Sequence, residues 1–156
     1  MTNFSPLQET SNLQELIKTT FDVNLDIEGG WGYNQEKATI IKTLPQGMPL
    51  KQLQHTLTTI RAHLEMNITQ EKEQRHGGIN ANETSRETHK DASQVFDKIS
   101  YEVTAIQESL YNAFIKEYKA GYENETLDLN EHFKKRKDAT ITREVTHYFE
   151  VSSVLK

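Results

Sequence analysis

The chain has 156 residues and a formal net charge of −5, and 35% of its residues are hydrophobic and 26% charged. This length predicts a single domain over residues 1–156 that buries its own core. The mild negative charge does not favour a general nucleic-acid binder, and the absence of cysteine excludes disulfides and thiolate metal sites. The sequence shows no signal peptide and no apolar run of membrane-spanning length, so we expect a cytoplasmic protein without a membrane anchor.

The first 44 residues predict a tail, a short helix and a β-hairpin. Residues 1–9 have the composition of a flexible tail, and Ser11 with Gln14 forms a capping box that predicts a helix start. The segment 21–28, "FDVNLDIE", alternates apolar and polar residues as a half-buried strand does. The segment 37–44, "KATIIKTL", is rich in β-branched residues, so we expect it to pair with the first strand across the glycine-rich stretch between them.

The middle of the chain predicts two long helices. Pro49 is suited to a helix start, and the apolar residues that follow recur at spacings of three and four as far as Ile68. Similar spacing recurs over residues 92–120, and residues 79–120 contain no glycine or proline. The segment "VFDKISYEV", residues 95–103, also fits strand alternation. The length of the row of apolar residues at spacings of three and four favours a helix.

These elements predict an α+β fold. The C-terminal segment "ATITREVTHYFEVSSVL", residues 139–155, is β-branched and aromatic and predicts a long strand. We therefore expect a small antiparallel sheet, formed by the N-terminal hairpin and this strand, packed against a long antiparallel helical hairpin. Residues 69–91 would be polar, projecting helix ends and their connecting loop. The segment "DLNEHFKKRKD", residues 128–138, is compatible with a short helix or a strand.

The glycine-rich stretch is the first candidate site. Its glycines permit a close approach of the backbone to a ligand, and its aromatic rings offer stacking surfaces. Neighbouring carboxylates on one face of the predicted strand could supply charge. The alternative is a hairpin turn with its tryptophan folded over the sheet, and a solvated strand face neutralised by Lys37 and Lys42. The candidate ligand-binding residues are Asp26, Glu28, Gly29, Gly30, Trp31 and Tyr33.

A second apolar stripe on the second predicted helix is the candidate interaction surface. It lies beside the main seam and is wider than packing against one partner requires. Such a surplus of aromatic residues favours contact with another protein or with a second copy of the chain. The stripe consists of Tyr111, Ile115, Tyr118 and Tyr122.

A basic run near residue 135 is the third candidate surface. Four consecutive cations can meet the phosphates of a nucleic acid or an acidic partner. The alternative is a solvated helix face balanced by the acidic residues in the segment "ENETLDLNE" just upstream. The run consists of Lys134, Lys135, Arg136 and Lys137.

The sequence predicts no metal, no cofactor and no catalytic constellation. The Glu-x-x-His spacing occurs at Glu73 with His76 and at Glu144 with His147, but the second pair lies in a predicted strand, where residues three apart face opposite sides. A loop set of His76, Glu83, Glu87 and His89 has suitable donor types but no diagnostic spacing. The chain also contains neither a G-x-S-x-G elbow nor a phosphate-binding glycine fingerprint.

Taken together, these features favour a non-catalytic interaction or adaptor protein over an enzyme. We expect its partner to be a protein, with self-association through the helical aromatic surface as the leading form. The alternative is a small-molecule-binding protein or enzyme that uses the Trp31 turn, and a third hypothesis is nucleic-acid binding through Lys134 to Lys137.

Overall fold

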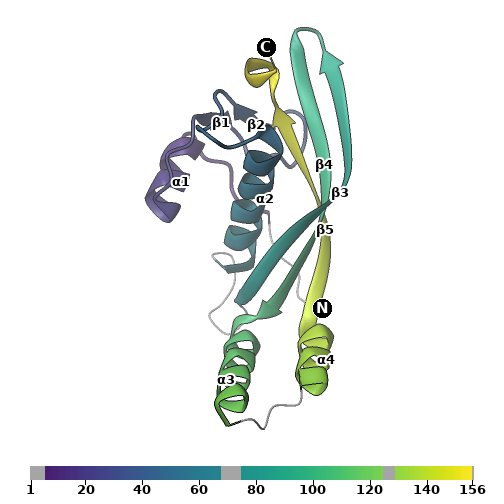
Figure 1. Cartoon of the computed structure of the whole chain (residues 1–156). Helices are drawn as coiled ribbons and strands as arrows, with labels where there is room; N and C mark the ends of the chain where they lie inside the picture. Colours follow the sequence, from purple (N-terminus) through teal and green to yellow (C-terminus); the bar gives the residue numbers. More distant parts are fainter. Residues whose placement is uncertain (1–5, 68–74, 125–128, 156) are drawn as a thin grey trace.

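The structure of the chain is a computed structural model that describes residues 6–67, 75–124 and 129–155 (Figure 1). These residues form four α-helices and five β-strands, followed by a short 3-10 helix. In chain order they are α1 (Leu13–Phe21), β1 (Ile27–Gly29), β2 (Thr39–Ile41), α2 (Leu50–Asn67), β3 (His76–Asp91), β4 (Gln94–Gln107), α3 (Glu108–Asn124), α4 (Leu129–Ala139), β5 (Thr140–Glu150) and η2 (Ser152–Val154).

The five strands form one mixed sheet in the order β1-β2-β5-β4-β3. The long strand β4 lies between β3 and β5 and pairs antiparallel with both along most of its length. The short hairpin β1–β2 joins the far edge of β5 through a parallel pairing of Thr39 with Phe149. The prediction that the C-terminal strand would join the hairpin in an antiparallel sheet is therefore wrong, because β2 and β5 run in the same direction.

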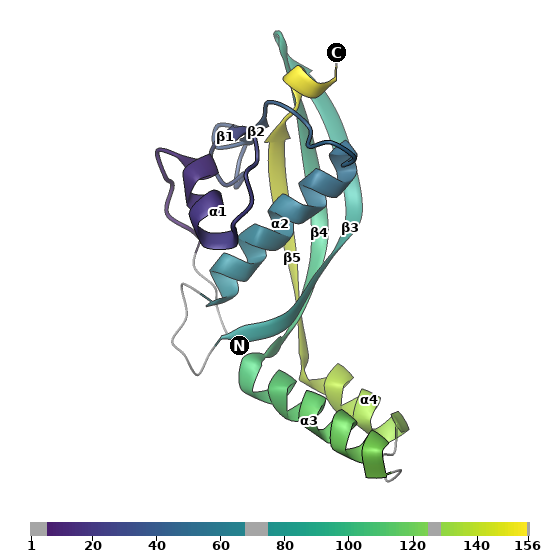
Figure 2. The ribbon, with the colours of Figure 1, turned by 60° about the vertical axis from the view of Figure 1, so that its left-hand side comes forward.

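Helix α2 lies along one face of the long strands and covers the core (Figure 2). On β4 the side chains facing this core alternate with more exposed ones, and Ile99, Tyr101 and Val103 are at most 1% exposed. Leu53, Leu57 and other apolar residues of α2 meet them. This one-sided burial is typical of an antiparallel sheet with one packed and one solvated face.

The predicted long helical hairpin is also wrong. Residues 76–91, expected as helix end and loop, form β3, and residues 94–107, expected as helix, form β4. Helix is found only in the last part of the second predicted helix, as α3. The two-residue turn between β3 and β4 contains Ala92 with φ +56° and no glycine, so the usual signal of a hairpin is missing from the sequence.

Other predicted elements are confirmed. The α+β class, the helix after residue 12, the N-terminal hairpin, the helix after Pro49 and the C-terminal strand are all present. The predicted cap is displaced by one residue, because Asn12 caps α1 by accepting a hydrogen bond from the Glu15 amide at 3.0 Å.

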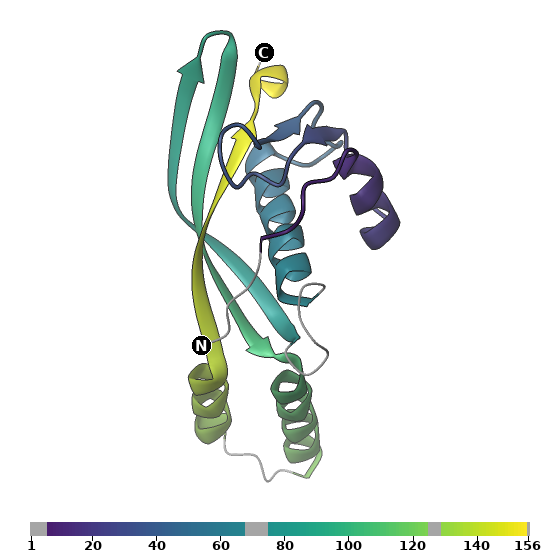
Figure 3. The ribbon, with the colours of Figure 1, turned by 180° about the vertical axis from the view of Figure 1, so that it is seen from behind.

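Helices α3 and α4 stand at one end of the molecule, away from α2. They are inserted between β4 and β5, so both helices continue from strands that are neighbours in the sheet (Figures 1 and 3). The turn between β3 and β4 lies at the opposite end of the molecule. Among the described helices, none combines the length and the apolar composition needed to cross a membrane.

Candidate functional site

The glycine-rich loop between β1 and β2 is packed from both sides. Trp31 is 3% exposed, and its indole Nε1 donates to the Gln8 carbonyl oxygen at 3.1 Å. The Trp31 amide donates to Glu9 Oε2 at 3.3 Å, and the Leu7 amide donates to the Tyr33 hydroxyl at 2.8 Å. Residues 7–9 of the expected tail therefore cover this loop. Trp31 is part of the core, and ligand binding by the loop stays a prediction.

The strand carboxylates Asp26 and Glu28 lie at the surface. Glu28 forms an ion pair with Lys42 at 3.3 Å, as the cross-strand alternative predicts, and Asp26 Oδ2 accepts a hydrogen bond from Thr43 Oγ1 at 2.7 Å. Gly29 has φ +85°, and a Cβ there would lie 2.5 Å from the Ala38 carbonyl oxygen. The glycine is thus required by the hairpin itself.

A buried polar ridge on α2 was not predicted from the sequence. Its four side chains are at most 3% exposed and recur at spacings of four, three and four, beside the leucine seam. Their partners come from the neighbouring strands and the glycine-rich loop. The helical spacing of these polar residues is visible in the sequence, but an interpretation based on the apolar residues alone misses it. The ridge consists of Gln54, Thr58, Arg61 and Glu65.

Arg61 and Glu65 connect the ridge to the loop. The Arg61 guanidinium donates to the carbonyl oxygens of Trp31 at 3.2 Å and Thr146 at 3.0 Å, and lies 4.7 Å from the centre of the Tyr33 ring. The Tyr33 hydroxyl donates to Glu65 Oε2 at 2.5 Å. Burial, with the hydrogen bond to Glu65, raises the pKa of Tyr33 well above its usual value. Partners within the protein use these groups, so we assign the ridge a structural role.

His147 on β5 occupies the centre of the same network. Its Nε2 is 2.9 Å from Thr39 Oγ1, its Nδ1 is 3.0 Å from Thr58 Oγ1, and its ring stacks on Phe149 with centroids 4.0 Å apart. Burial, with a smaller contribution from the charge of Arg61, lowers the pKa of His147 well below its usual value. The ring is therefore neutral at pH 7, with one nitrogen donating and one accepting. It bridges strand, loop and helix.

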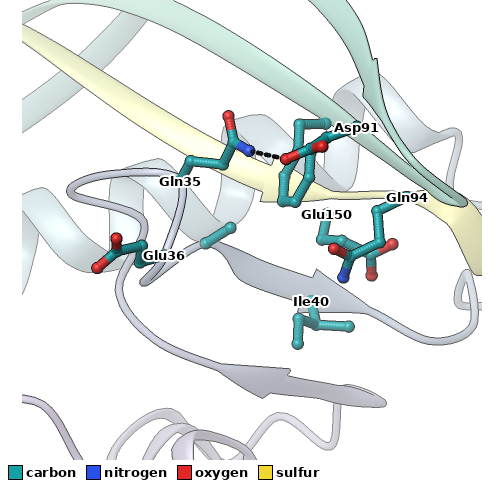
Figure 4. Close-up of a pocket in the computed structure, with 8 residues that line it drawn as sticks. Gln35, Glu36, Ile40, Asp91, Gln94 and Glu150 are labelled. Atoms are coloured by element: carbon teal, nitrogen blue, oxygen red, sulfur yellow. Dashed lines mark hydrogen bonds between the residues drawn. The ribbon is translucent and has the colours of Figure 1, made fainter.

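An open groove of about 540 Å³ lies between the β1–β2 loop and the turn of the β3–β4 hairpin (Figure 4). Its floor includes Ile40 and Phe96, and its charged groups are all acidic: Glu36, Asp91 and Glu150. Gln35 Nε2 donates to Asp91 Oδ2 at 3.1 Å across the groove. We call this surface the acidic groove.

The predicted aromatic stripe lies on α3, as expected, but its members divide between two places. Tyr111 packs over the backbone of β3, where a Cβ at Gly78 would lie 2.9 Å from its Cε2 atom. Ile115 and Tyr118 face α4 and line a pocket of about 280 Å³ between the helices. The side chain of Tyr122 lies outside the described residues. Exposed apolar side chains remain on this helix pair: Leu110 is 42%, Tyr118 40% and Phe133 51% exposed.

His132 on α4 forms the inner wall of that pocket. It is 1% exposed, and neither ring nitrogen has a hydrogen-bond partner among the described residues. Glu117 Oε1 is 3.8 Å from Nδ1, beyond hydrogen-bond distance. A buried imidazole without partners costs about 1–3 kcal/mol relative to a bonded one. His132 was not among the predicted site residues, because the sequence around it, residues 128–138, was compatible with either a helix or a strand.

The basic run lies on α4, and its cations point in several directions. Lys135 Nζ is 3.8 Å from Glu117 Oε1 and 3.6 Å from Glu131 Oε1. Arg136 lines the pocket, as does Lys119 on α3. Lys134 and Lys137 are exposed and form no ion pair with the described residues. The run is therefore a partly neutralised helix face with free cations at its rim.

The histidines considered as metal ligands are dispersed. His76 is buried at the start of β3, and its amide donates to Asn67 Oδ1 at 3.1 Å, while His89 Nε2 lies 2.7 Å from Gln35 Oε1 at the other end of the strand. Glu73 lies outside the described residues. Within the described ranges, no three or more His, Asp or Glu side chains come together in a way that could hold a metal ion.

No protein-family model, curated protein or solved structure matches this chain. Two of the described surfaces are unlike the rest: the acidic groove at one end of the molecule, and the helix pair α3–α4, with its basic and aromatic side chains, at the other.

Proposed function

We propose that the chain is a non-catalytic interaction protein that associates with itself, with the α3–α4 pair of one copy docking against the acidic groove of the next. The observation that carries this proposal is the position of the basic run on α4 at one end of the molecule and of the acidic groove at the other. Charge complementarity of this kind steers association and selects the partner.

The two surfaces carry side chains of complementary type. The α3–α4 end offers the exposed rings of Tyr118 and Phe133 with free cations beside them. The acidic groove offers the apolar side chains of Ile40 and Phe96 together with the exposed carboxylates of Glu36 and Asp91. An apolar centre surrounded by a charged rim is the usual anatomy of a protein interface.

A single copy cannot bring these surfaces together. They lie at opposite ends of the long strands, with the sheet between them (Figures 1 and 3). Contact therefore takes place between copies and joins two different surfaces. Such a head-to-tail contact closes into a ring or continues as a filament, depending on the rotation between neighbours.

The test reverses the charge of each surface separately and then mixes the variants. Lys134→Glu with Lys137→Glu makes both surfaces acidic, and Glu36→Lys with Asp91→Lys makes both basic. Each double variant alone should associate at least about 10-fold more weakly than wild type in sedimentation at low salt, because like charges then face each other. An equimolar mixture should regain association, since each copy then meets a neighbour of opposite charge.

The controls separate this proposal from its alternatives. Lys18→Glu with Lys51→Glu, on exposed positions of α1 and α2, should leave association unchanged. Nucleic-acid binding through α4 would be weakened by Lys134→Glu with Lys137→Glu and would not be restored by the groove variant. Wild-type protein that stays monomeric at low salt, or a mixture that does not regain association, would contradict head-to-tail docking.

A further inference from the structure

We propose that the pocket between α3 and α4 is a binding site for a small organic acid, with an apolar body held by the aromatic walls and a carboxylate held by His132, Lys119 and Arg136. This goes beyond self-association. It concerns the interior of the helix pair rather than its rim.

The pocket contains an unsatisfied imidazole. His132 is almost wholly buried, yet both of its ring nitrogens are without hydrogen-bond partners among the described residues. Buried polar groups in folded proteins are nearly always bonded, and an exception calls for an explanation. A carboxylate that enters the pocket and displaces the side chains covering the ring nitrogens would accept a hydrogen bond from this ring.

The walls of the pocket are largely aromatic. Three aromatic rings surround the imidazole, with centroid separations of 5.9 Å for Phe114, 5.6 Å for Tyr118 and 5.6 Å for Phe133. Ile115 extends this lining. Aromatic walls favour a flat apolar body that can meet their faces and edges.

The charged groups that line the pocket are positive. The charged side chains that line the pocket along with the imidazole are both cations, Lys119 and Arg136, and neither forms an ion pair with the described residues. Glu117 does not line the pocket, and its Oε1 is 3.8 Å from both His132 Nδ1 and Lys135 Nζ, so that Lys135 balances its charge. The pocket therefore selects an anion, and Arg136 can bind both oxygens of a carboxylate.

The volume limits the size of the ligand. The pocket holds about 280 Å³, just below the roughly 300 Å³ at which pockets for drug-sized ligands begin. One aromatic ring with a short acid chain fits this space. Fatty acids with long chains do not.

The experiment follows wild-type, full-length protein by NMR during titration with 3-phenylpropionate. We expect saturable binding, with a dissociation constant of roughly a millimolar or below, shifts confined to α3 and α4, and a change in the His132 ring nitrogen signals as one of them becomes bonded. Two matched probes share the apolar body: 3-phenylpropan-1-ol lacks the charge and 3-phenylpropylamine reverses it. Both should bind at least about 10-fold more weakly.

Variants then assign the residues. His132→Phe, which fills the space without hydrogen bonding, and Arg136→Gln should each weaken binding of the acid by about 10-fold or more. Lys134→Gln, on the same helix but outside the lining, should stay within about twofold of wild type. If His132→Phe does not fold, His132→Gln replaces it, and the ring nitrogen signals of the wild type need no substitution.

Several outcomes would overturn the proposal. They are the absence of saturable shifts, equal binding of acid, alcohol and amine, or a His132 ring that does not respond. Failure here is distinguishable from failure of self-association, because the association test alters Lys134, Lys137, Glu36 and Asp91, which do not line this pocket.

Discussion

Single polar residues determine where α2 can sit. Arg61 is 2% exposed and its donors reach carbonyl oxygens on two different segments, so a shift of the helix by one turn would leave a buried charge without partners. The same holds for Thr58, whose hydroxyl is matched to His147. The leucine seam supplies apolar burial but would tolerate several axial positions. The polar ridge therefore selects one arrangement of helix, strand and loop.

Gly32 lets the loop approach His147, and its replacement tests how closely the two are packed. Its φ is +83°, and a Cβ there would overlap the His147 ring and lie 2.8 Å from the Tyr148 carbonyl oxygen. We expect Gly32→Ala to lower the free energy of unfolding by about 3 kcal/mol, from backbone strain and overpacking together. Urea unfolding at neutral pH measures the loss.

Gly47 provides the matched control. Its φ is +77°, but a Cβ there would meet no atom within 4 Å, so Gly47→Ala carries the backbone strain alone. We expect a loss of about 1 kcal/mol. Equal losses at the two glycines would contradict the close packing of loop and imidazole.

At the scale of elements, the hairpin β3–β4 explains why the fold was only partly predictable. The row of β4 that faces α2 includes Asp97 as well as Ile99, Tyr101 and Val103. A buried carboxylate interrupts the apolar alternation, and the remaining apolar residues then fit helical spacing too. On β3 most side chains are exposed, so that strand has no period of two to detect.

The candidate surfaces were predictable to a different degree. Helix α3 and the C-terminal strand follow from local patterns, and so does the aromatic stripe at Ile115 and Tyr118. The His132 pocket and the acidic groove do not, because each combines residues from elements that are distant in sequence or whose type was undecided. Their detection required the pairing of strands.

Asp97 joins three elements, and its removal should loosen α2 from the hairpin. Its carboxylate accepts hydrogen bonds from Gln54 at 2.8 Å, Thr88 at 2.5 Å and Arg86 at 3.2 Å. We expect Asp97→Ala to cost about 2–3 kcal/mol of stability, since the buried amide of Gln54 loses its acceptor and Thr88 and Arg86 each lose a partner. Glu87→Ala, on an exposed neighbouring position, should change stability by less than about 0.5 kcal/mol. Similar effects at both positions in chemical denaturation would contradict this role.

At the scale of the whole molecule, α3 and α4 are inserted in the chain between two neighbouring strands and are not part of the core. The buried hydrophobic cluster, as described, draws on α1, α2 and the strands and contains no residue from 108–139. Ile106 of β4 and Thr140 of β5 are paired directly, so the two strands meet where the insertion begins and ends. The residues of the core cluster and those that line the α3–α4 pocket therefore belong to separate parts of the chain.

This separation predicts that the insertion can be removed without loss of the fold. Replacing residues 107–139 by Asn-Gly would connect Ile106 to Thr140 through a two-residue turn, which suits antiparallel neighbours. We expect cooperative urea unfolding to persist and the far-UV circular dichroism to lose the signal of the two helices, since the core cluster keeps all its members. The packing of Tyr111 over Gly77 and Gly78 would be lost, at a cost of about 1–2 kcal/mol.

The same variant tests the division of roles. Without α3 and α4 the variant should not bind 3-phenylpropionate. It should bind wild-type copies only through its acidic groove, which would still accept the α3–α4 end of a wild-type neighbour. Binding of this kind would stop further growth of the assembly. A variant that unfolds would show that α3 and α4 belong to the core after all. A folded variant that still binds the acid would place that site elsewhere, because the His132 pocket is then gone.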